Sequence, residues 1–162
     1  MVSRASELID ALGMQPHPEG GHYVEIYRST TRVQPKDARP ERSALTTIYF
    51  LLTEGDISRW HRVAGSDEVW HFYEGAPLEL LTAGQAFQRL DRHVLGPVSS
   101  NQRPVHVVEA GLWQAARSTG EYTLVGCTVG PGFEFADFAM LRDDPETAEQ
   151  ARRRQPDAAA FL

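Results

Sequence analysis

The sequence predicts an all-β protein of the sandwich or barrel class with a short helix near each end. Between residues 44 and 129 the chain breaks into short β-branched and aromatic runs, which Gly, Pro, Asp and Asn separate. Even spacing of short strands with tight turns is typical of sandwiches and barrels rather than of parallel α/β sheets. The length of 162 residues fits one domain, and a hydrophobic content of 41% is ordinary for a protein with a substantial core.

The N-terminal helix is predicted by its two ends. Ser3 is a good N-cap residue for a helix over residues 7–12, and Gly13 has the freedom to adopt the left-handed conformation that ends a helix. We therefore expect one short helix before the first strand.

A turn rich in proline and glycine, PHPEGG at residues 16–21, precedes a strand over residues 22–28. In this turn we expect Glu19 to stabilise the turn itself and His17 to lie in a loop at the rim. Residues 29–43 are polar, contain two prolines and lack a clear period, so we expect a long loop there.

The central strands follow from the period-2 and β-branched runs. They are expected over residues 45–52, 58–63, 69–73, 78–82, 86–90, 105–108, 113–117 and 122–129. An aromatic strand over residues 133–138 follows Pro131 and Gly132. Asp144 and Pro145 then begin a final helix in which acidic residues come early and arginines late, as the helix dipole favours.

Composition excludes several classes of protein. The formal net charge of −6 disfavours binding to phosphate backbones, so we expect no nucleic-acid partner. The longest nearly apolar run, residues 44–52, is too short to span a bilayer, so we expect no membrane partner. The start MVSRASELID lacks an apolar signal core and Cys127 is the single cysteine, which together predict a cytoplasmic protein without disulfides.

Residues 55–75, GDISRWHRVAGSDEVWHFYEG, resemble the first metal motif of the cupins: a glycine, five residues, His-x-His, four residues, a glutamate, six residues and a glycine. His61 and Glu68 stand in this register, whereas Val63 replaces the second histidine. Side chains two apart on a strand share a face. His61 and Val63 are therefore expected to point into a cavity that Glu68 enters from the returning strand.

In the second cupin motif, Gln114 stands in place of the last histidine ligand, and Gly111 alone is kept. A carboxamide oxygen is a weak ligand for ions that prefer imidazole or thiolate, so His61, Glu68 and Gln114 form a poor metal site. We expect no metal and no other cofactor.

Four ordered blocks of the chain resemble the Cupin_5 family, also called DUF985. The blocks are LGMQPHPEGGHYVEIYRS, ALTTIYFLL, SRWHRVAGSDEVWHFYEGAPLEL and LVGCTVGPGFEFADF, and the resemblance covers roughly residues 12–141. It implies a cupin jelly-roll β-barrel over about residues 21–141 of a single domain spanning residues 1–162, with a small-molecule cavity. It also implies a homodimer, in which we expect the strand at residues 22–28 to pad the partner's sheet. It implies no established reaction.

Strand phase predicts which side chains share the cavity. Those expected on the inner face are Arg59, His61, Val63, Glu68, Trp70, Phe72 and Gln114. His61 and Glu68 are the candidate catalytic residues. We expect Arg59, Trp70, Phe72 and Gln114 to bind the ligand, and His71 to lie on the outer face.

Three classes of function fit these residues. The first is a metal-independent isomerase- or epimerase-like enzyme on a small sugar-like or carboxylate substrate, in which Glu68 raises the pKa of His61 so that the histidine acts as a base near neutral pH. The second is a non-catalytic protein that binds a small ligand, in which His61 and Glu68 form a structural pair. The third, less favoured because of Val63 and Gln114, is a metal-dependent dioxygenase or lyase.

Overall fold

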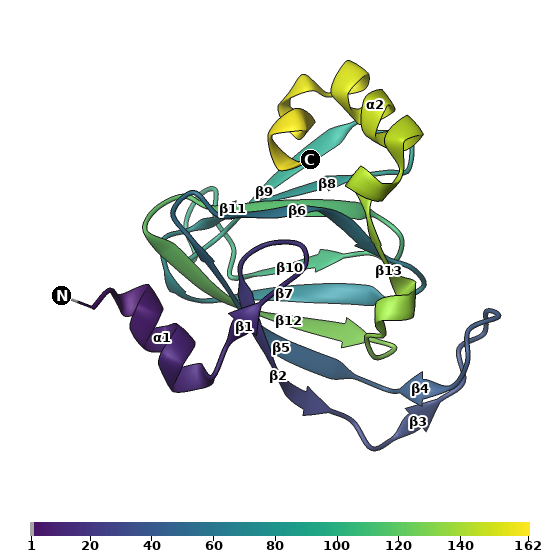
Figure 1. Ribbon diagram of the computed structural model, residues 1–162, viewed down its shortest axis with the longest axis horizontal. Coiled ribbons are helices and arrows are strands. Elements are labelled where there is room, and N and C mark those ends of the chain that lie inside the picture. The colour runs from purple at the N-terminus through teal and green to yellow at the C-terminus, as the bar shows by residue number, and fades with distance from the viewer. Residues whose placement is uncertain (1) are drawn as a thin grey trace.

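Two antiparallel β-sheets face each other in the computed structural model, which describes residues 2–162 (Figure 1). The six-stranded sheet has the order β1 (Gln15–Pro16), β2 (His22–Arg28), β5 (Thr46–Thr53), β12 (Tyr122–Gly130), β7 (Asp67–Gly75), β10 (Val105–Val108). The five-stranded sheet has the order β13 (Phe138–Met140), β6 (Ile57–Val63), β11 (Trp113–Ser118), β8 (Leu78–Ala83), β9 (Leu90–Leu95). Strands distant in sequence are neighbours in both sheets, as a jelly roll requires, and the predicted fold class is confirmed.

The helix α1 (Arg4–Leu12) covers part of the outer face of the six-stranded sheet. The Ser3 side chain accepts the N–H of Ser6 and Gly13 ends the helix in the left-handed conformation, so both predicted caps are confirmed. Its buried Leu8 packs with Leu51 and Leu124 on the outer side of β5 and β12.

The C-terminal segment covers the outer face of the five-stranded sheet. Asp144 caps α2 (Pro145–Arg154) by accepting the N–H of Thr147, as the sequence predicts for this helix start. The 3-10 turns η2 (Leu141–Asp143) and η3 (Pro156–Phe161) flank it. Buried Trp60 packs with Phe161 in this layer and donates its indole N–H to the carbonyl of Ala158. None of the helices within residues 2–162 is long and apolar enough to cross a membrane.

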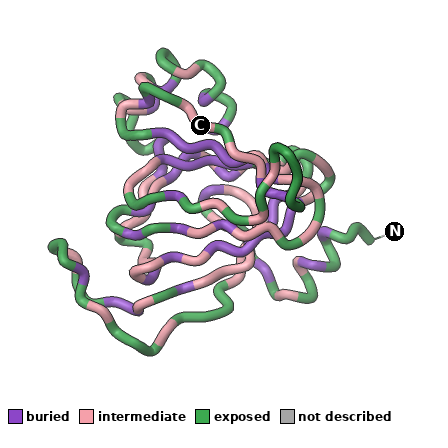
Figure 2. The backbone as a smooth tube through the Cα atoms, turned by 180° about the vertical axis from the view of Figure 1, so that it is seen from behind, coloured by how far each residue is buried: buried purple, intermediate pink, exposed green. Residues whose placement is uncertain are grey.

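The interior between the sheets is packed at one end and hollow at the other. Inward side chains of both sheets fill the packed end, and they are Phe50, Leu52, Trp70, Leu78, Leu80, Leu95, Val108, Ala116, Val125 and Cys127. Figure 2 shows buried residues along the strands of both sheets, whereas the segment between β2 and β5 is largely exposed. The hollow end lies beside β13, whose Phe138 lines it.

Three expected elements differ from those of the structure. Residues 86–90 form a turn rather than a strand, and the strand begins where they end, as β9. Residues 133–138 contain a 3-10 turn, η1 (Phe135–Asp137), and only Phe138 belongs to a strand. The expected loop at residues 29–43 contains a short hairpin of β3 (Arg32–Val33) and β4 (Arg42–Ser43).

Two buried charges explain why this hairpin is ordered. The Arg42 side chain, which is 2% exposed, donates to the carboxylate of Asp137 in η1. Arg39 donates to the same carboxylate over 3.4 Å and to the carbonyl of Gly65 over 2.6 Å. The hairpin therefore fixes the position of η1, whose first residue lies at the cavity mouth.

Candidate functional site

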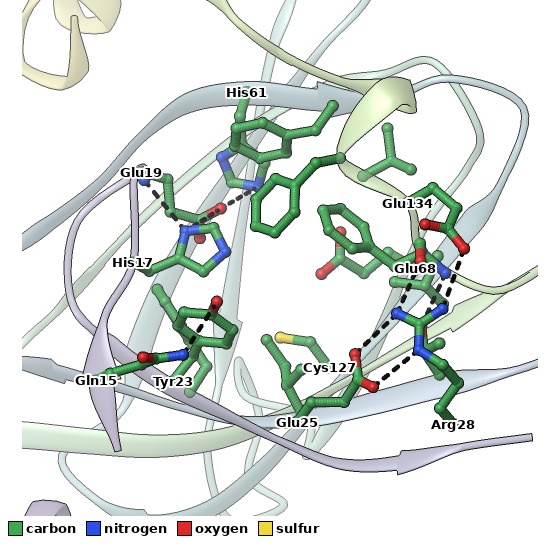
Figure 3. Close-up of a pocket in the computed structure, with 18 residues that line it drawn as sticks. Gln15, His17, Glu19, Tyr23, Glu25, Arg28, His61, Glu68, Cys127 and Glu134 are labelled. Carbon is green, nitrogen blue, oxygen red and sulfur yellow. Dashed lines mark hydrogen bonds and ion pairs between the residues drawn. The ribbon is translucent and has the colours of Figure 1, made fainter.

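A cavity of about 170 Å³ occupies the hollow end of the barrel (Figure 3). Its walls come from the N-terminal turn, the inward faces of β2, β5, β6, β7 and β12, and the segment around η1. The lining residues are Gln15, His17, Glu19, Tyr23, Glu25, Arg28, Thr46, Ile48, Phe50, His61, Val63, Glu68, Cys127, Val129, Phe133, Glu134, Phe135 and Phe138.

The turn before β2 inserts Glu19 into the closed end of this cavity. Gly20 has a φ of 113°, and a Cβ atom there would lie 2.0 Å from the backbone oxygen of Ile57, so only glycine permits this approach to β6. The Arg59 N–H donates to the Glu19 carbonyl over 2.8 Å, and the Ser58 hydroxyl donates to Glu19 Oε1 over 2.7 Å. The Glu19 side chain is therefore held inside the barrel. The expectation that it stabilises the turn was wrong.

His61 and Glu19 form a direct contact at this closed end. His61 Nδ1 lies 2.7 Å from the carbonyl oxygen of Arg59, which can only accept, so Nδ1 carries a proton. His61 Nε2 lies 3.2 Å from Glu19 Oε2. One further proton therefore lies between these two atoms and belongs either to the carboxyl group or to the imidazole.

Burial decides where that proton lies. It raises the pKa of Glu19 to about 8, although the hydrogen bond from Ser58 opposes the shift. Burial lowers the pKa of His61, and it outweighs the opposing charge of Glu68. At pH 7 the site thus holds a carboxylic acid next to a neutral imidazole. The expectation that Glu68 raises the pKa of His61 overall was wrong, because the cost of burying the imidazolium is larger.

His17 lies beside this pair rather than in a rim loop away from it. Its Nδ1 accepts the N–H of Glu19 over 3.1 Å and lies 3.5 Å from Glu19 Oε2. Burial, together with the nearby charge of His61, lowers the pKa of His17 to about 3. His17 is therefore neutral at physiological pH.

Glu68 enters the same cavity from β7, as predicted, but its hydrogen bond is to Gln114. Gln114 Nε2 donates to Glu68 Oε2 over 2.5 Å, and Gln114 Oε1 accepts the indole N–H of Trp70 over 2.8 Å. Burial raises the pKa of Glu68, and the charge of Glu19 adds to that effect. The chain of hydrogen bonds fixes the Glu68 carboxyl group at the cavity wall.

The open end of the cavity carries an ion-pair cluster. Arg28 donates to both oxygens of Glu25 over 2.9 Å each, to Glu134 Oε1 over 3.2 Å and to the carbonyl of Phe133 over 3.1 Å. These side chains are between 37% and 45% exposed, whereas those of Glu19 and His61 are 8% and 2% exposed. The cavity therefore runs from a charged, partly exposed mouth to a buried acid–base pair.

The structure brings together only some of the residues predicted for the site. His61 and Glu68 line the cavity, but Trp70, Phe72 and Gln114 lie deeper, among the side chains of the packed end. Arg59 is not a lining residue either, and its guanidinium lies beside Gly20.

A β-bulge in β6 accounts for the position of Arg59. Gln114 pairs with His61 and Ala116 pairs with Ser58, so Arg59 and Trp60 together face one residue of β11. The bulge shifts the inward phase by one position, and Ser58 takes the place expected for Arg59. A bulge leaves no clear signal in the sequence.

Sequence reasoning also missed the aromatic and acidic residues outside the two motifs. Tyr23, Glu25 and Phe138 belong to segments near the two ends of the chain that the topology places over the cavity. The alternation of Tyr23 and Glu25 in the strand after the turn was the one available signal for that face.

A metal ion, which cupin folds often bind, does not fit this donor set. The Gln114 oxygen already accepts the Trp70 N–H, Val63 offers no donor, and His17 Nδ1 accepts the Glu19 N–H. Within residues 2–162, no three His, Cys, Asp or Glu side chains are grouped so that they could hold an ion. We therefore assign no step to a metal.

Comparisons with solved structures find the same architecture over nearly the whole chain. A hypothetical protein from Leishmania major is 30% identical with a TM-score of 0.83, over 98% of this chain and 97% of that one. A protein from Shewanella oneidensis is 29% identical with a TM-score of 0.86, over 99% and 98%. Oxalate decarboxylase from Bacillus subtilis is 13% identical with a TM-score of 0.58, over 80% and 30%, which concerns the fold alone.

No curated protein matches the sequence. The family model described as Cupin superfamily (DUF985), Cupin_5, matches residues 6–141. This match covers most of the chain, and the ordered motifs and the two-sheet barrel agree with it. The chain therefore belongs to the Cupin_5 (DUF985) family of the cupin superfamily.

Proposed function

We propose that this cupin binds a small molecule in the cavity and catalyses a proton transfer on it without a metal, as an isomerase or epimerase does. The observation that carries the proposal is the 3.2 Å contact between His61 Nε2 and Glu19 Oε2 at the closed end of an aromatic cavity. Isomerisation needs one group that removes a proton and one that returns it. A carboxylic acid and a neutral imidazole in contact supply both at pH 7.

Each residue has a role in this proposal. His61 is the base: its Nδ1–H is fixed on the Arg59 carbonyl, and Nε2, which accepts the Glu19 proton in the empty site, can take a proton from the substrate once Glu19 donates its own proton to the substrate. Glu19 is the acid, kept protonated by burial and oriented by Ser58. Glu68, held by Gln114, is a second acid facing the same space.

Deuterium exchange tests the proposal before a substrate is known. The protein is incubated in D₂O with a panel of small α-hydroxy and α-amino carbonyl compounds, and loss of C–H signal is followed by proton NMR. We expect exchange into at least one compound, and a loss of about 100-fold or more in both His61→Gln and Glu19→Gln. Glu121→Gln is the matched control, since Glu121 is exposed and lies outside the cavity.

A non-catalytic binding protein is the second candidate. It is favoured by the chain from Glu68 through Gln114 to Trp70, in which the buried polar groups already satisfy one another as a structural network would. A compound that binds in the cavity while none of the panel exchanges would establish this candidate in place of the first.

Assembly as a homodimer belongs to the same proposal. The outer face of the six-stranded sheet exposes apolar side chains beyond the area that α1 covers. Tyr73 on β7 is 51% exposed, and Val105 and Val107 on β10 are 44% and 49% exposed. The strand β2 pairs with β5 of its own chain, and Ile26 and Tyr27 on it are 46% and 53% exposed.

A second copy of the chain would bury this face, since apolar area of this kind is typical of subunit contacts. We expect light scattering at micromolar concentration to report about twice the 18.1 kDa chain mass. A mass of one chain would contradict the dimer.

We also propose a cytoplasmic location. It is favoured by a buried cysteine that has no second cysteine in the sequence to pair with, and cell fractionation tests it.

A further inference from the structure

Building on the proposed function, we infer that the molecule this cavity takes is a small organic cation, a compound with an ammonium group held by aromatic rings and carboxylates. The inference rests on three features of the lining: its charges, its rings and its volume.

The lining has more carboxyl groups than basic side chains that could pair with an anion. Four glutamates, Glu19, Glu25, Glu68 and Glu134, face one arginine, Arg28. Arg28 is already paired with two of these carboxylates, over 2.9 Å and 3.2 Å, and its third partner is a backbone carbonyl. A carboxylate or phosphate ligand would have to displace those glutamates, so an anion is disfavoured at the mouth as well as at the closed end.

The two histidines of the lining add no positive charge. His17 accepts the Glu19 N–H on Nδ1, and burial keeps its pKa at about 3. Burial also lowers the pKa of His61. Arg59, which was expected to bind the ligand, does not line the cavity and so adds no positive charge to it either.

Five of the lining residues are phenylalanine or tyrosine. Phe133, Phe135 and Phe138 form one wall, with ring centroids 5.0 to 6.0 Å apart. Tyr23 and Phe50 also line the cavity, and their rings lie 4.6 Å and 5.8 Å from the ring of His17. The faces of phenyl and phenol rings attract cations, most strongly where water is excluded, and such cages are the usual site for alkylated ammonium groups.

The volume restricts the size of the cation. About 170 Å³ corresponds to roughly five or six water molecules at ~30 Å³ each. A compound of the size of choline fits this space, with the ammonium group among the rings and its other end at Glu19 and His61. Figure 3 shows Glu19 and His61 on the side of the cavity opposite Arg28, Glu25 and Glu134.

Cation binding should release protons from the cavity. Burial and mutual repulsion favour the protonated forms of Glu19 and Glu68 in the empty site, whereas a cation favours their ionised forms. The other titratable and charged groups that share this space are His17, Tyr23, Glu25, Arg28, His61, Cys127 and Glu134. Affinity for a cation should therefore rise between pH 6 and about 8, by up to about tenfold per pH unit for one coupled proton.

The test compares molecules of equal shape and different charge. Calorimetric titrations use choline, tetramethylammonium and propylammonium, the neutral isostere 3,3-dimethyl-1-butanol in place of choline, and acetate as the anion. We expect at least one cation to bind about tenfold or more tightly than the neutral isostere, and acetate to bind weakest. If every cation binds no more tightly than the isostere, or if acetate binds best, the inference is wrong.

Variants locate the effect in the cavity. Glu68→Gln and Phe138→Leu should each weaken the best cation several-fold while leaving the isostere nearly unchanged, whereas Glu121→Gln should change neither. Circular dichroism shows whether each variant is folded. If a variant is unfolded, the comparison of cations with the neutral isostere in the original protein still tests the inference. Cation selectivity without deuterium exchange would support this inference and overturn the proposed reaction. Exchange on a neutral or anionic compound, without cation selectivity, would support the proposed reaction and overturn this inference.

Discussion

Replacing Glu19 with glutamine isolates the effect of one buried carboxyl group on stability. A glutamine oxygen can still accept the Ser58 hydroxyl, and its amide can donate to His61 Nε2 in place of the carboxylic acid. Glu19→Gln therefore resembles the protonated form of the residue at every pH. Any difference in pH dependence between the two proteins reports the ionisation of Glu19.

The sign follows from the raised pKa. Below pH 4.5 the carboxyl group is protonated in both the folded and the unfolded chain, so ionisation costs nothing. Between pH 4.5 and about 8 the unfolded chain ionises while the folded chain keeps its proton, and the free energy of unfolding falls as pH rises. At ~1.4 kcal/mol per pH unit over this interval, the full loss approaches about 5 kcal/mol.

Urea denaturation at each unit from pH 5 to pH 9 measures this difference. We expect the difference in free energy of unfolding, Glu19→Gln minus the original protein, to increase steadily up to about pH 8 and to stay constant above it. Glu121→Gln should follow the original protein throughout, because Glu121 is exposed. Parallel curves for Glu19→Gln across the whole range would refute the buried, protonated carboxyl group and with it the acid of the proposed reaction.

Three further outcomes are expected. Gly20→Ala should cost about 2 to 4 kcal/mol by thermal melts, because its Cβ would meet a backbone oxygen of β6, whereas Gly55→Ala, with similar positive φ but open space, should cost about 1; equal costs would contradict the close approach. Asp137→Asn should cost about 3 kcal/mol or more by leaving Arg42 buried without its counter-charge, whereas Asp37→Asn should change stability far less because Asp37 is half exposed; a small loss at Asp137 would count against the buried pair. Elemental analysis should find no stoichiometric transition metal, and about one ion per chain, removable by chelator with loss of activity, would overturn the metal-free site.

The strands were predictable because their pattern is local. Period-2 runs and turn residues locate the barrel strands to within a few residues, and the strand over Val105–Val108 agrees at both ends. The errors fall where tertiary contacts override that pattern. Residues 133–138 are aromatic enough for a strand, but the burial of Arg42 against Asp137 draws them into a turn.

The site was less predictable because its polar contacts join distant segments. The cupin register located His61 and Glu68 correctly, since both lie on strands adjacent in sequence. Glu19 contacts His61 across 42 positions through a turn whose direction depends on close backbone contact at Gly20. The one-residue bulge in β6 turns Ser58 inward in place of Arg59. No property of either side chain indicates in the sequence that the bulge is there.

The His61–Glu19 contact occupies the position that holds a metal ligand in the cupin register. In the cupin register the imidazole of His61 is a metal ligand, and a metal must displace the proton of each ligand that it binds. Here Nε2 of that imidazole faces a carboxyl group that is itself buried and carries a proton at neutral pH. The closed end thus keeps a transferable proton where a related barrel would keep an ion. With two of the nearby glutamates uncharged, an incoming ammonium group supplies the positive charge that lets them ionise, so binding and the release of a proton are linked at one site.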